Sequence, residues 1–124
     1  MASATTIFIP GLLCTEYLFH HQRDAMPGGA VFADTRQHDT MTAMAEAALA
    51  QAPGQLIPIG LSMGGYVALE MARLAPSRIS AMALLSTSCR QDNAAQRAYR
   101  EQAIKLAGQD GFRGVTRQFL GKCL

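Results

Sequence analysis

The chain has 124 residues and a formal net charge of +2, and 49% of its residues are hydrophobic. This length suits one domain, and the balanced composition is that of a soluble globular protein and excludes a disordered chain. No apolar stretch approaches the ~20 residues that a membrane-spanning helix needs. We therefore expect no membrane span.

The charge is unevenly placed along the chain. Residues 1–89 carry four basic and six acidic side chains, a net charge of −2, whereas residues 90–124 carry seven basic and three acidic ones, a net charge of +4. We interpret the basic residues of the C-terminal part as solvated faces of helices and expect no nucleic-acid partner; a surface for another anionic partner is the alternative. These residues are Arg90, Arg97, Arg100, Lys105, Arg113, Arg117 and Lys122.

Cysteine usage and the N-terminus indicate the compartment. Cys14, Cys89 and Cys123 are odd in number and lack the spacing of a disulfide framework or a zinc site, which favours free thiols in a reducing environment. The N-terminus has no basic segment of the kind that opens a signal peptide, and Pro10-Gly11 interrupts the first apolar run. These features predict a cytoplasmic protein.

The first half of the chain alternates apolar runs with helical segments. Residues 5–9 are short, apolar and β-branched, and Pro10-Gly11 ends them, as expected of a buried strand that opens into a loop. We then predict a short helix over 15–22, a strand over 30–33, a helix over 40–51 capped by Asp39, and a strand over 56–59.

The second half continues this order and then changes. Residues 64–75 have few polar side chains, which predicts a helix buried on most sides, and Pro76 ends it. A fourth strand is predicted over 79–85. Two helices, over 93–107 and 112–120, follow without a fifth strand.

This order of elements predicts the fold class. Strands that alternate with helices and are nearly all apolar indicate an α/β fold with a parallel sheet of about four strands, covered by helices on both faces. Pro58 conflicts with a place in a central strand because it has no N–H to donate. We expect a local bulge or one unpaired carbonyl there.

The sequence Gly60-Leu61-Ser62-Met63-Gly64 joins the third predicted strand to the following helix. A serine hydroxyl is a poor nucleophile, so it must be presented on a sharp turn beside a base. Glycine is needed two residues before and after the serine because larger residues would collide with the strand or helix, and the Met63 N–H at the helix start would face developing negative charge. The alternative is a tight connection that cradles a phosphate, although no Gly-Lys-Ser/Thr follows.

Three segments together resemble the α/β-hydrolase superfamily: Ile7 to Cys14, Gly60 to Ala72, and Ile79 to Ser88, in the family's order. The resemblance covers residues 5 to 88. It implies that residues 1–88 are the N-terminal part of the hydrolase core and that 89–124 are the start of a helical lid, truncated. It also implies a second oxyanion N–H from Leu12, with Pro10-Gly11 as an ordinary strand exit as the alternative. No metal or organic cofactor is implied.

The family's triad acid and histidine follow the serine in the chain. The histidines of this sequence, His20, His21 and His38, all precede Ser62, so we expect the triad Asp and His to be missing; substitution by one of these histidines is the alternative. The other candidates are read as structural, with Cys14 a small buried hydrophobe and the acids at loops or helix caps. These acids are Asp34, Asp39 and Asp92.

The predicted function is that of a serine hydrolase acting on small-molecule carboxylic esters, lactones or related acyl substrates. The resemblance implies an N-terminal fragment that is nearly inactive alone. The alternative is a shortened, non-catalytic binding or assembly protein. In either case an uncovered sheet edge favours self-association.

Overall fold

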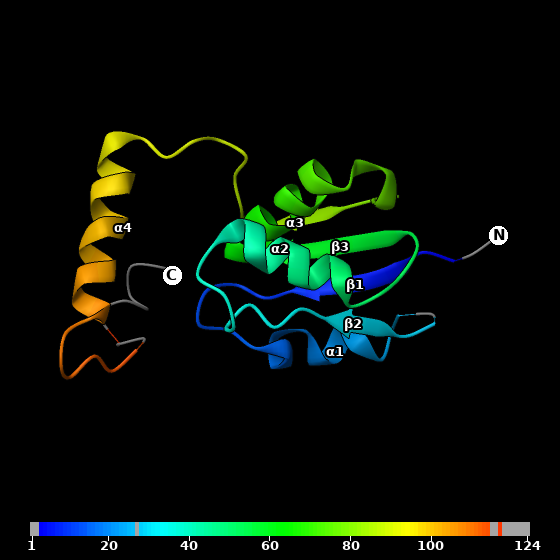
Figure 1. Cartoon of the computed structure of the whole chain (residues 1–124). Helices are drawn as coiled ribbons and strands as arrows, with labels where there is room; N and C mark the ends of the chain where they lie inside the picture. Colours follow the sequence, from blue (N-terminus) through cyan, green and yellow to red (C-terminus); the bar gives the residue numbers. More distant parts are fainter. Residues whose placement is uncertain (1–2, 27, 115–116, 118–124) are drawn as a thin grey trace. The chain divides into compact units, whose positions relative to one another are not determined.

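The computed structural model describes residues 3–26, 28–114 and 117. The chain divides into two compact units, Met1–Cys89 and Arg90–Leu124. The first unit holds the sheet and most of the helices, and the second holds one long helix (Figure 1).

The first unit is built on one parallel sheet with the strand order β2-β1-β3-β4. The strands are β1 (Thr5–Ile9), β2 (Ala30–Phe32), β3 (Leu56–Leu61) and β4 (Ala83–Leu85). The predicted α/β class with a four-stranded parallel sheet flanked by helices is confirmed. The fourth strand is shorter than predicted because residues 79–82 pair with β3 only through an isolated bridge between Ile79 and Leu56.

Pro58 is accommodated by a gap in pairing. Of the two outcomes expected, a local bulge or one unpaired carbonyl, the bulge is absent from the pairing with β1. The β1–β3 register runs without interruption through Ile7 and Pro58. The Leu56 carbonyl accepts a hydrogen bond from the Ser80 N–H, so backbone groups at alternate residues of β3, Pro58 included, face β4. Pairing with β4 resumes only at Ile59, so the missing N–H falls where no partner strand needs it.

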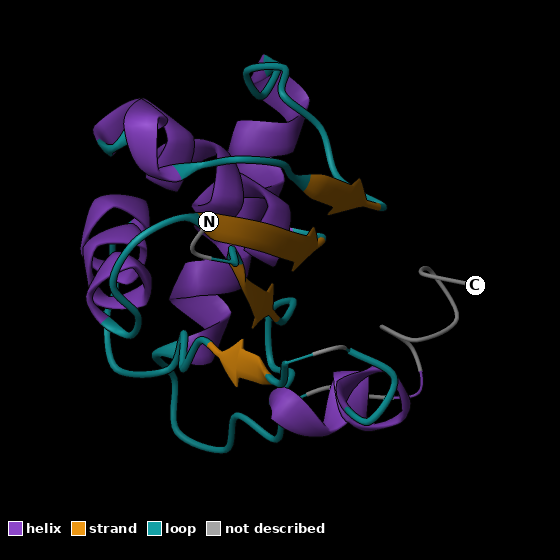
Figure 2. Cartoon of the chain, turned by 90° about the vertical axis from the view of Figure 1, so that its right-hand side faces the viewer, coloured by secondary structure: helices purple, strands orange, loops and turns teal. Residues whose placement is uncertain are grey.

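Two helices cover one face of the sheet. Helices α2 (Met41–Ala50) and α3 (Met63–Leu74) bury their small and apolar side chains against β1 and β3 (Figures 1 and 2). The largest fully buried aliphatic side chains of this core are Ile7, Ile9, Leu56, Val67 and Met71. Burial of this apolar surface is the main stabilising contribution to the unit.

The N-terminus of α2 corrects one prediction. Thr40, and not Asp39, is the cap: its backbone is extended and its hydroxyl accepts a hydrogen bond from the Ala43 N–H at 3.2 Å. The helix therefore begins at Met41, one residue after the start at Thr40 that a cap at Asp39 would give. A threonine with extended backbone can satisfy the free N–H groups of the first turn as well as an aspartate can.

The opposite face of the sheet is covered only in part. Phe8 stacks on Phe19, with 4.7 Å between ring centroids, and on Phe32 of β2 at 5.5 Å. Phe19 belongs to the segment predicted as a helix over 15–22, which forms a 3-10 turn, η1 (Glu16–Phe19), followed by α1 (His20–Arg23). On β4, Leu84 and Leu85 remain 41% and 43% exposed. Helical cover on both faces therefore holds at β1, whereas the side chains of Leu84 and Leu85 on β4 stay exposed.

Two polar links join the helical layer. The Thr42 hydroxyl of α2 donates to Glu70 of α3 at 2.7 Å, and Glu70 also forms an ion pair with Arg73 at 2.7 Å. Arg78, in the turn η2 (Pro76–Arg78), donates to the carbonyls of Leu49, Ala52 and Gly54 at and beyond the end of α2. A cation there offsets the negative end of the helix dipole.

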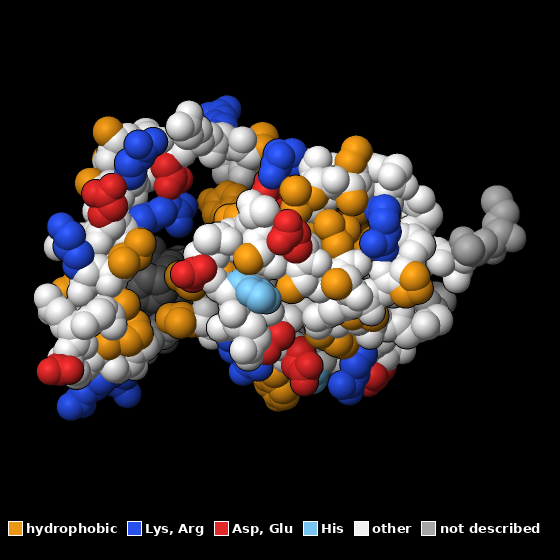
Figure 3. Space-filling view, viewed as in Figure 1, with side chains coloured by type: hydrophobic (Ala, Val, Ile, Leu, Met, Phe, Trp, Pro, Cys, Tyr) orange, Lys and Arg blue, Asp and Glu red, His pale blue; other side chains and the backbone are white. Residues whose placement is uncertain are grey.

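The second unit contains α4 (Ala94–Ala107), which confirms the helix predicted over 93–107. Asn93 and Gln96 form a capping box at its start, and Asp92 pairs with Arg100 at 2.6 Å. Residues of α4 are exposed, and acidic and basic side chains are interspersed over the face seen in Figure 3. The helix predicted over 112–120 lies largely outside the described residues; Phe112 is not helical. Among the described residues, no helix combines the length and apolarity needed to cross a membrane.

The Glu70 link predicts a specific dependence of stability on pH. Hydrogen bonds from Arg73 and Thr42 lower the pKa of Glu70 from 4.5 to about 2. A carboxylate with a depressed pKa stabilises the fold above its unfolded pKa and loses that contribution as pH falls towards the folded value. Glu70→Gln should lower the thermal unfolding midpoint at pH 7, and the difference from the parent should vanish between about pH 4.5 and pH 2.

The matched control is Glu46→Gln, which removes an exposed carboxylate from α2. It should leave the pH dependence of the midpoint unchanged. Equal effects of the two substitutions across the pH range would contradict a specific role for Glu70.

Candidate functional site

Ser62 lies at the turn between β3 and α3. Its backbone has φ 53° and ψ −114°, a strained conformation for a residue with a side chain, and the residue is exposed. Although Ser62 is the N-cap of α3, its side chain does not cap the helix, and within the described part of the chain its hydroxyl forms no hydrogen bond. The turn thus presents a free hydroxyl at the carboxyl end of a central strand.

The flanking glycines are required by close backbone contacts. A Cβ at Gly60 would lie 2.7 Å from the Gly65 nitrogen and closer still to the backbone of Gly64. A Cβ at Gly64 would lie 2.8 Å from the Pro10 oxygen and closer still to the Ile9 carbonyl. Real Cβ atoms do not approach backbone so closely, so side chains at either position would force the turn or the end of β1 to move.

The loop after β1 lies beside this turn. A Cβ built on Gly11 would be 3.5 Å from the Ser62 Cβ, and the loop is closed by a hydrogen bond from the Cys14 N–H to the Gly11 carbonyl at 3.1 Å. The backbone N–H groups of Leu12 and Met63 donate no hydrogen bond among the described residues. Two unused donors therefore belong to the two segments that meet at Ser62.

Residues with strained backbone angles lie at the carboxyl edge of the sheet. Among the described residues other than glycine, positive φ angles occur at Leu13, Ser62 and Ser86, with values of 60°, 53° and 46°. These residues follow β1, β3 and β4, which are neighbours in the sheet. Strain of this kind persists only where surrounding contacts hold it, and such positions cluster at functional sites.

The Ser62 backbone is held by three hydrogen bonds. Its N–H donates to the Leu85 carbonyl at 2.9 Å, and its carbonyl accepts from the Gly65 N–H at 3.0 Å and from the Thr87 hydroxyl at 2.8 Å. The motif alone did not identify Thr87. The run of polar residues Ser86-Thr87-Ser88 after an apolar strand of a parallel sheet is the signal that could have pointed to this edge.

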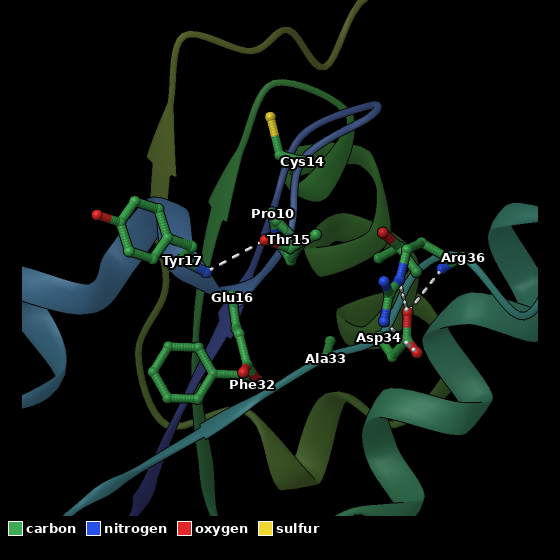
Figure 4. Close-up of a pocket in the computed structure, with 10 residues that line it drawn as sticks. Pro10, Cys14, Thr15, Glu16, Tyr17, Phe32, Ala33, Asp34 and Arg36 are labelled. Atoms are coloured by element: carbon green, nitrogen blue, oxygen red, sulfur yellow. Dashed lines mark hydrogen bonds and ion pairs between the residues drawn. The ribbon is translucent and has the colours of Figure 1, made fainter. Parts of the chain in front are cut away.

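A cavity of about 340 Å³ lies at the ends of β1 and β2 (Figure 4). Figure 4 shows the Asp34–Arg36 ion pair, 2.8 Å between Nε and Oδ1, on one side and Tyr17 and Phe32 on the other. Hydrogen bonds from Arg36 hold the pKa of the Asp34 carboxyl well below its usual range. Asp34 is thus a loop residue that forms an ion pair with Arg36. The full lining is Pro10, Cys14, Thr15, Glu16, Tyr17, Phe32, Ala33, Asp34, Thr35 and Arg36.

The lining of this cavity does not include Ser62. It shares Pro10 and Cys14 with the loop that borders the serine turn, so the cavity neighbours the site through that loop.

Cys14 was predicted to be buried and is half-buried, with its thiol free. Cys89 is also a free thiol.

None of the histidines of the described residues is hydrogen-bonded to Ser62. His20 Nδ1 lies 2.7 Å from the Tyr17 carbonyl oxygen, and the His20 ring stacks on Tyr17 and contacts the His21 ring at a tilt of 39°. His38 is exposed. In residues 3–26, 28–114 and 117, no hydrogen bond joins a histidine or a carboxylate to Ser62, and no group of three metal-binding side chains occurs.

Comparison with known proteins places this arrangement in a family. The family model for the alpha/beta hydrolase fold matches residues 15–118, most of the chain, including the Ser62 turn. The chain belongs to the α/β-hydrolase family. The matched region begins after Leu12, so the loop that follows β1 is only partly within it.

Solved structures of esterases share the fold. A thermophilic esterase from Thermogutta terrifontis, with malate bound, aligns with a TM-score of 0.71 and 22% identity over 88% of this chain and 46% of its own. A marine microorganism esterase aligns with a TM-score of 0.56 and 15% identity over 98% of this chain and 53% of its own. The chain thus spans about half the length of these two esterases. The search of curated proteins found no match.

The contact between the first turn of α3 and the end of β1 can be tested by adding one methyl group. Gly64→Ala should destabilise the protein by about 2–3 kcal/mol, because the new Cβ meets rigid backbone of Ile9 and Pro10. Urea unfolding followed by circular dichroism measures the loss.

Gly11→Ala is the matched control in the same unit. Its Cβ would have an ordinary contact, 3.4 Å from the Leu61 carbonyl oxygen, so the cost should stay within about 1 kcal/mol. Equal stability of the two variants would show that the turn and the end of β1 are farther apart than described.

Proposed function

We propose that Ser62 is the nucleophile of a hydrolase that acts on carboxylic esters or related acyl substrates. The observation that carries this proposal is the turn itself: a strained, exposed serine without a hydrogen-bond partner for its hydroxyl, flanked by two glycines that admit no side chain. Membership of the α/β-hydrolase family and likeness to two esterases support it.

In this proposal the Ser62 hydroxyl attacks the acyl carbonyl carbon and loses its proton to a base. The carbonyl oxygen becomes an oxyanion, which the Leu12 and Met63 N–H groups would stabilise. Collapse of the intermediate expels the alcohol, which takes up the proton, and leaves an acyl group on Ser62. Water then attacks this acyl-enzyme, releasing the carboxylic acid and restoring the serine.

We propose that the base and its orienting acid lie outside residues 1–124, because this mechanism needs both and no histidine or carboxylate among the described residues is hydrogen-bonded to Ser62. His20 is turned to Tyr17 and His38 is exposed, and neither is hydrogen-bonded to Ser62. The alignments cover only 46% and 53% of the two solved esterases, so each of those chains is about twice as long as this one. We therefore propose that residues 1–88 form the N-terminal part of the core, that 89–124 begin a helical lid, and that residues 1–124 alone are nearly inactive.

A non-catalytic role is the second candidate. The absence of a base beside Ser62 among the described residues favours it. The exposed Leu84 and Leu85 of the edge strand β4 would then serve as a binding or self-association surface.

Labelling with a fluorophosphonate probe distinguishes the two candidates. The samples are residues 1–124, the Ser62→Ala variant, and the product of any longer reading frame with and without Ser62→Ala. We expect strong labelling of the longer product that Ser62→Ala abolishes, and little labelling of residues 1–124.

Labelling of the longer product that survives Ser62→Ala would overturn Ser62 as the nucleophile, and no labelling of any sample would favour the non-catalytic role. Strong labelling of residues 1–124 through Ser62 would show that a base lies within them. His20, His21 and His38 would then be the residues to substitute.

A further inference from the structure

Thr87 touches the serine turn from a separate element. It follows β4 by two residues, and its half-buried side chain donates a hydrogen bond from Oγ1 to the Ser62 carbonyl oxygen at 2.8 Å. The residue before it, Ser86, has a positive φ of 46°, so the chain leaves β4 through a strained turn to reach this position. The contact spans 25 positions in sequence and lies within the first unit.

The same side chain packs on the first turn of α3. A Cβ built on Gly65 would lie 2.5 Å from both Cγ2 and Oγ1 of Thr87 and 2.6 Å from its Cβ. Gly65 is buried, and only a glycine leaves room for the threonine at this distance. Thr87 is therefore fixed by its methyl group and its hydroxyl at once.

The Ser62 carbonyl and the Met63 N–H belong to one peptide group. A peptide group is planar, so a contact that fixes the direction of its carbonyl also fixes the direction of its N–H. The Ser62 carbonyl accepts two hydrogen bonds, from Thr87 and from the Gly65 N–H at 3.0 Å. Hydrogen bonds at the oxygen polarise the peptide and make its N–H a stronger donor.

We infer that Thr87 is a positioning residue that aims and polarises the Met63 N–H for an oxyanion and holds the strained backbone of Ser62. The inference rests on the proposed function, in which the Met63 N–H stabilises the oxyanion. Ser62 is held on its other side by the bond from its N–H to the Leu85 carbonyl at 2.9 Å. The end of β4 and the loop after it therefore hold both peptide groups of the serine.

Two variants separate the hydroxyl from the methyl group. Thr87→Val keeps the shape and removes the donor, whereas Thr87→Ser keeps the donor. In whichever form of the protein is labelled through Ser62, Thr87→Val should slow fluorophosphonate labelling about tenfold and Thr87→Ser by less than about threefold. With a p-nitrophenyl ester as substrate, Thr87→Val should lower kcat and leave KM nearly unchanged, because the oxyanion exists only in the transition state and intermediate.

A second readout does not depend on activity. In residues 1–124 labelled with ¹³C and ¹⁵N, Thr87→Val should move the carbonyl resonance of Ser62 and the amide resonance of Met63, and Thr87→Ser should leave both near their parent positions. Thr42→Val, which removes the hydroxyl bound to Glu70 on the helical layer, is the matched control and should move neither.

The outcomes are distinguishable. Unmoved resonances in Thr87→Val would overturn the contact whether or not the protein is active. Moved resonances with unchanged labelling and kcat would overturn its role in positioning. If no form is labelled through Ser62, the proposed function fails and the catalytic role of Thr87 fails with it, while the resonances still report separately whether the contact exists.

Discussion

The first turn of α3 passes in backbone contact with the end of β1, and the geometry of the whole site depends on this approach. Gly64 sits against the carbonyls of Ile9 and Pro10, and Gly60 sits against the backbone of Gly64 and Gly65. A single methyl group at either position would separate the two segments. Because they stay close, the loop carrying Leu12 lies beside Ser62, and two unused N–H groups come to the same edge of the sheet.

A turn this strained must be held by the structure around it. The buried core of β1, β3 and α3 provides most of that rigidity, through side chains such as Ile7, Val67 and Met71. Hydrogen bonds then hold the serine directly, from the end of β4 and from Thr87. The links at Glu70 and Arg78 tie α2 to α3 and to the turn after it.

Ser62 and the unused N–H groups of Leu12 and Met63 belong to segments that meet at one edge of the sheet. Among the described residues, no histidine or carboxylate forms a hydrogen bond with the serine hydroxyl. The sheet is also covered unevenly. Strand β1 is covered on both faces, whereas the edge strand β4 leaves Leu84 and Leu85 exposed. The chain covers 46% and 53% of the lengths of the two esterases with which it aligns.

Local patterns in the sequence were enough to predict the elements and the serine turn. These patterns are local because the residues that form each of them lie within a few positions of one another. Examples are the β-branched run at residues 5–9 ended by Pro10, the apolar helix after Ser62, and the glycines at 60 and 64. Near neighbours in sequence also explain the one wrong cap, since Asp39 and Thr40 are both suitable and the backbone angles decide between them.

Contacts between distant segments were decided only in the tertiary structure. The gap in pairing opposite Pro58 depends on the path of residues 79–82. The contact of Thr87 with Ser62 depends on β4 lying next to β3. Neither the path nor the strand order leaves a periodic signal in the sequence. The orientation of His20 towards Tyr17 likewise follows from how the 3-10 turn packs through Phe19 on Phe8. Sequence alone therefore determined which residues form the serine turn. Tertiary packing decided which contacts hold that turn, because hydrogen bonds across a sheet edge join residues that share no local pattern.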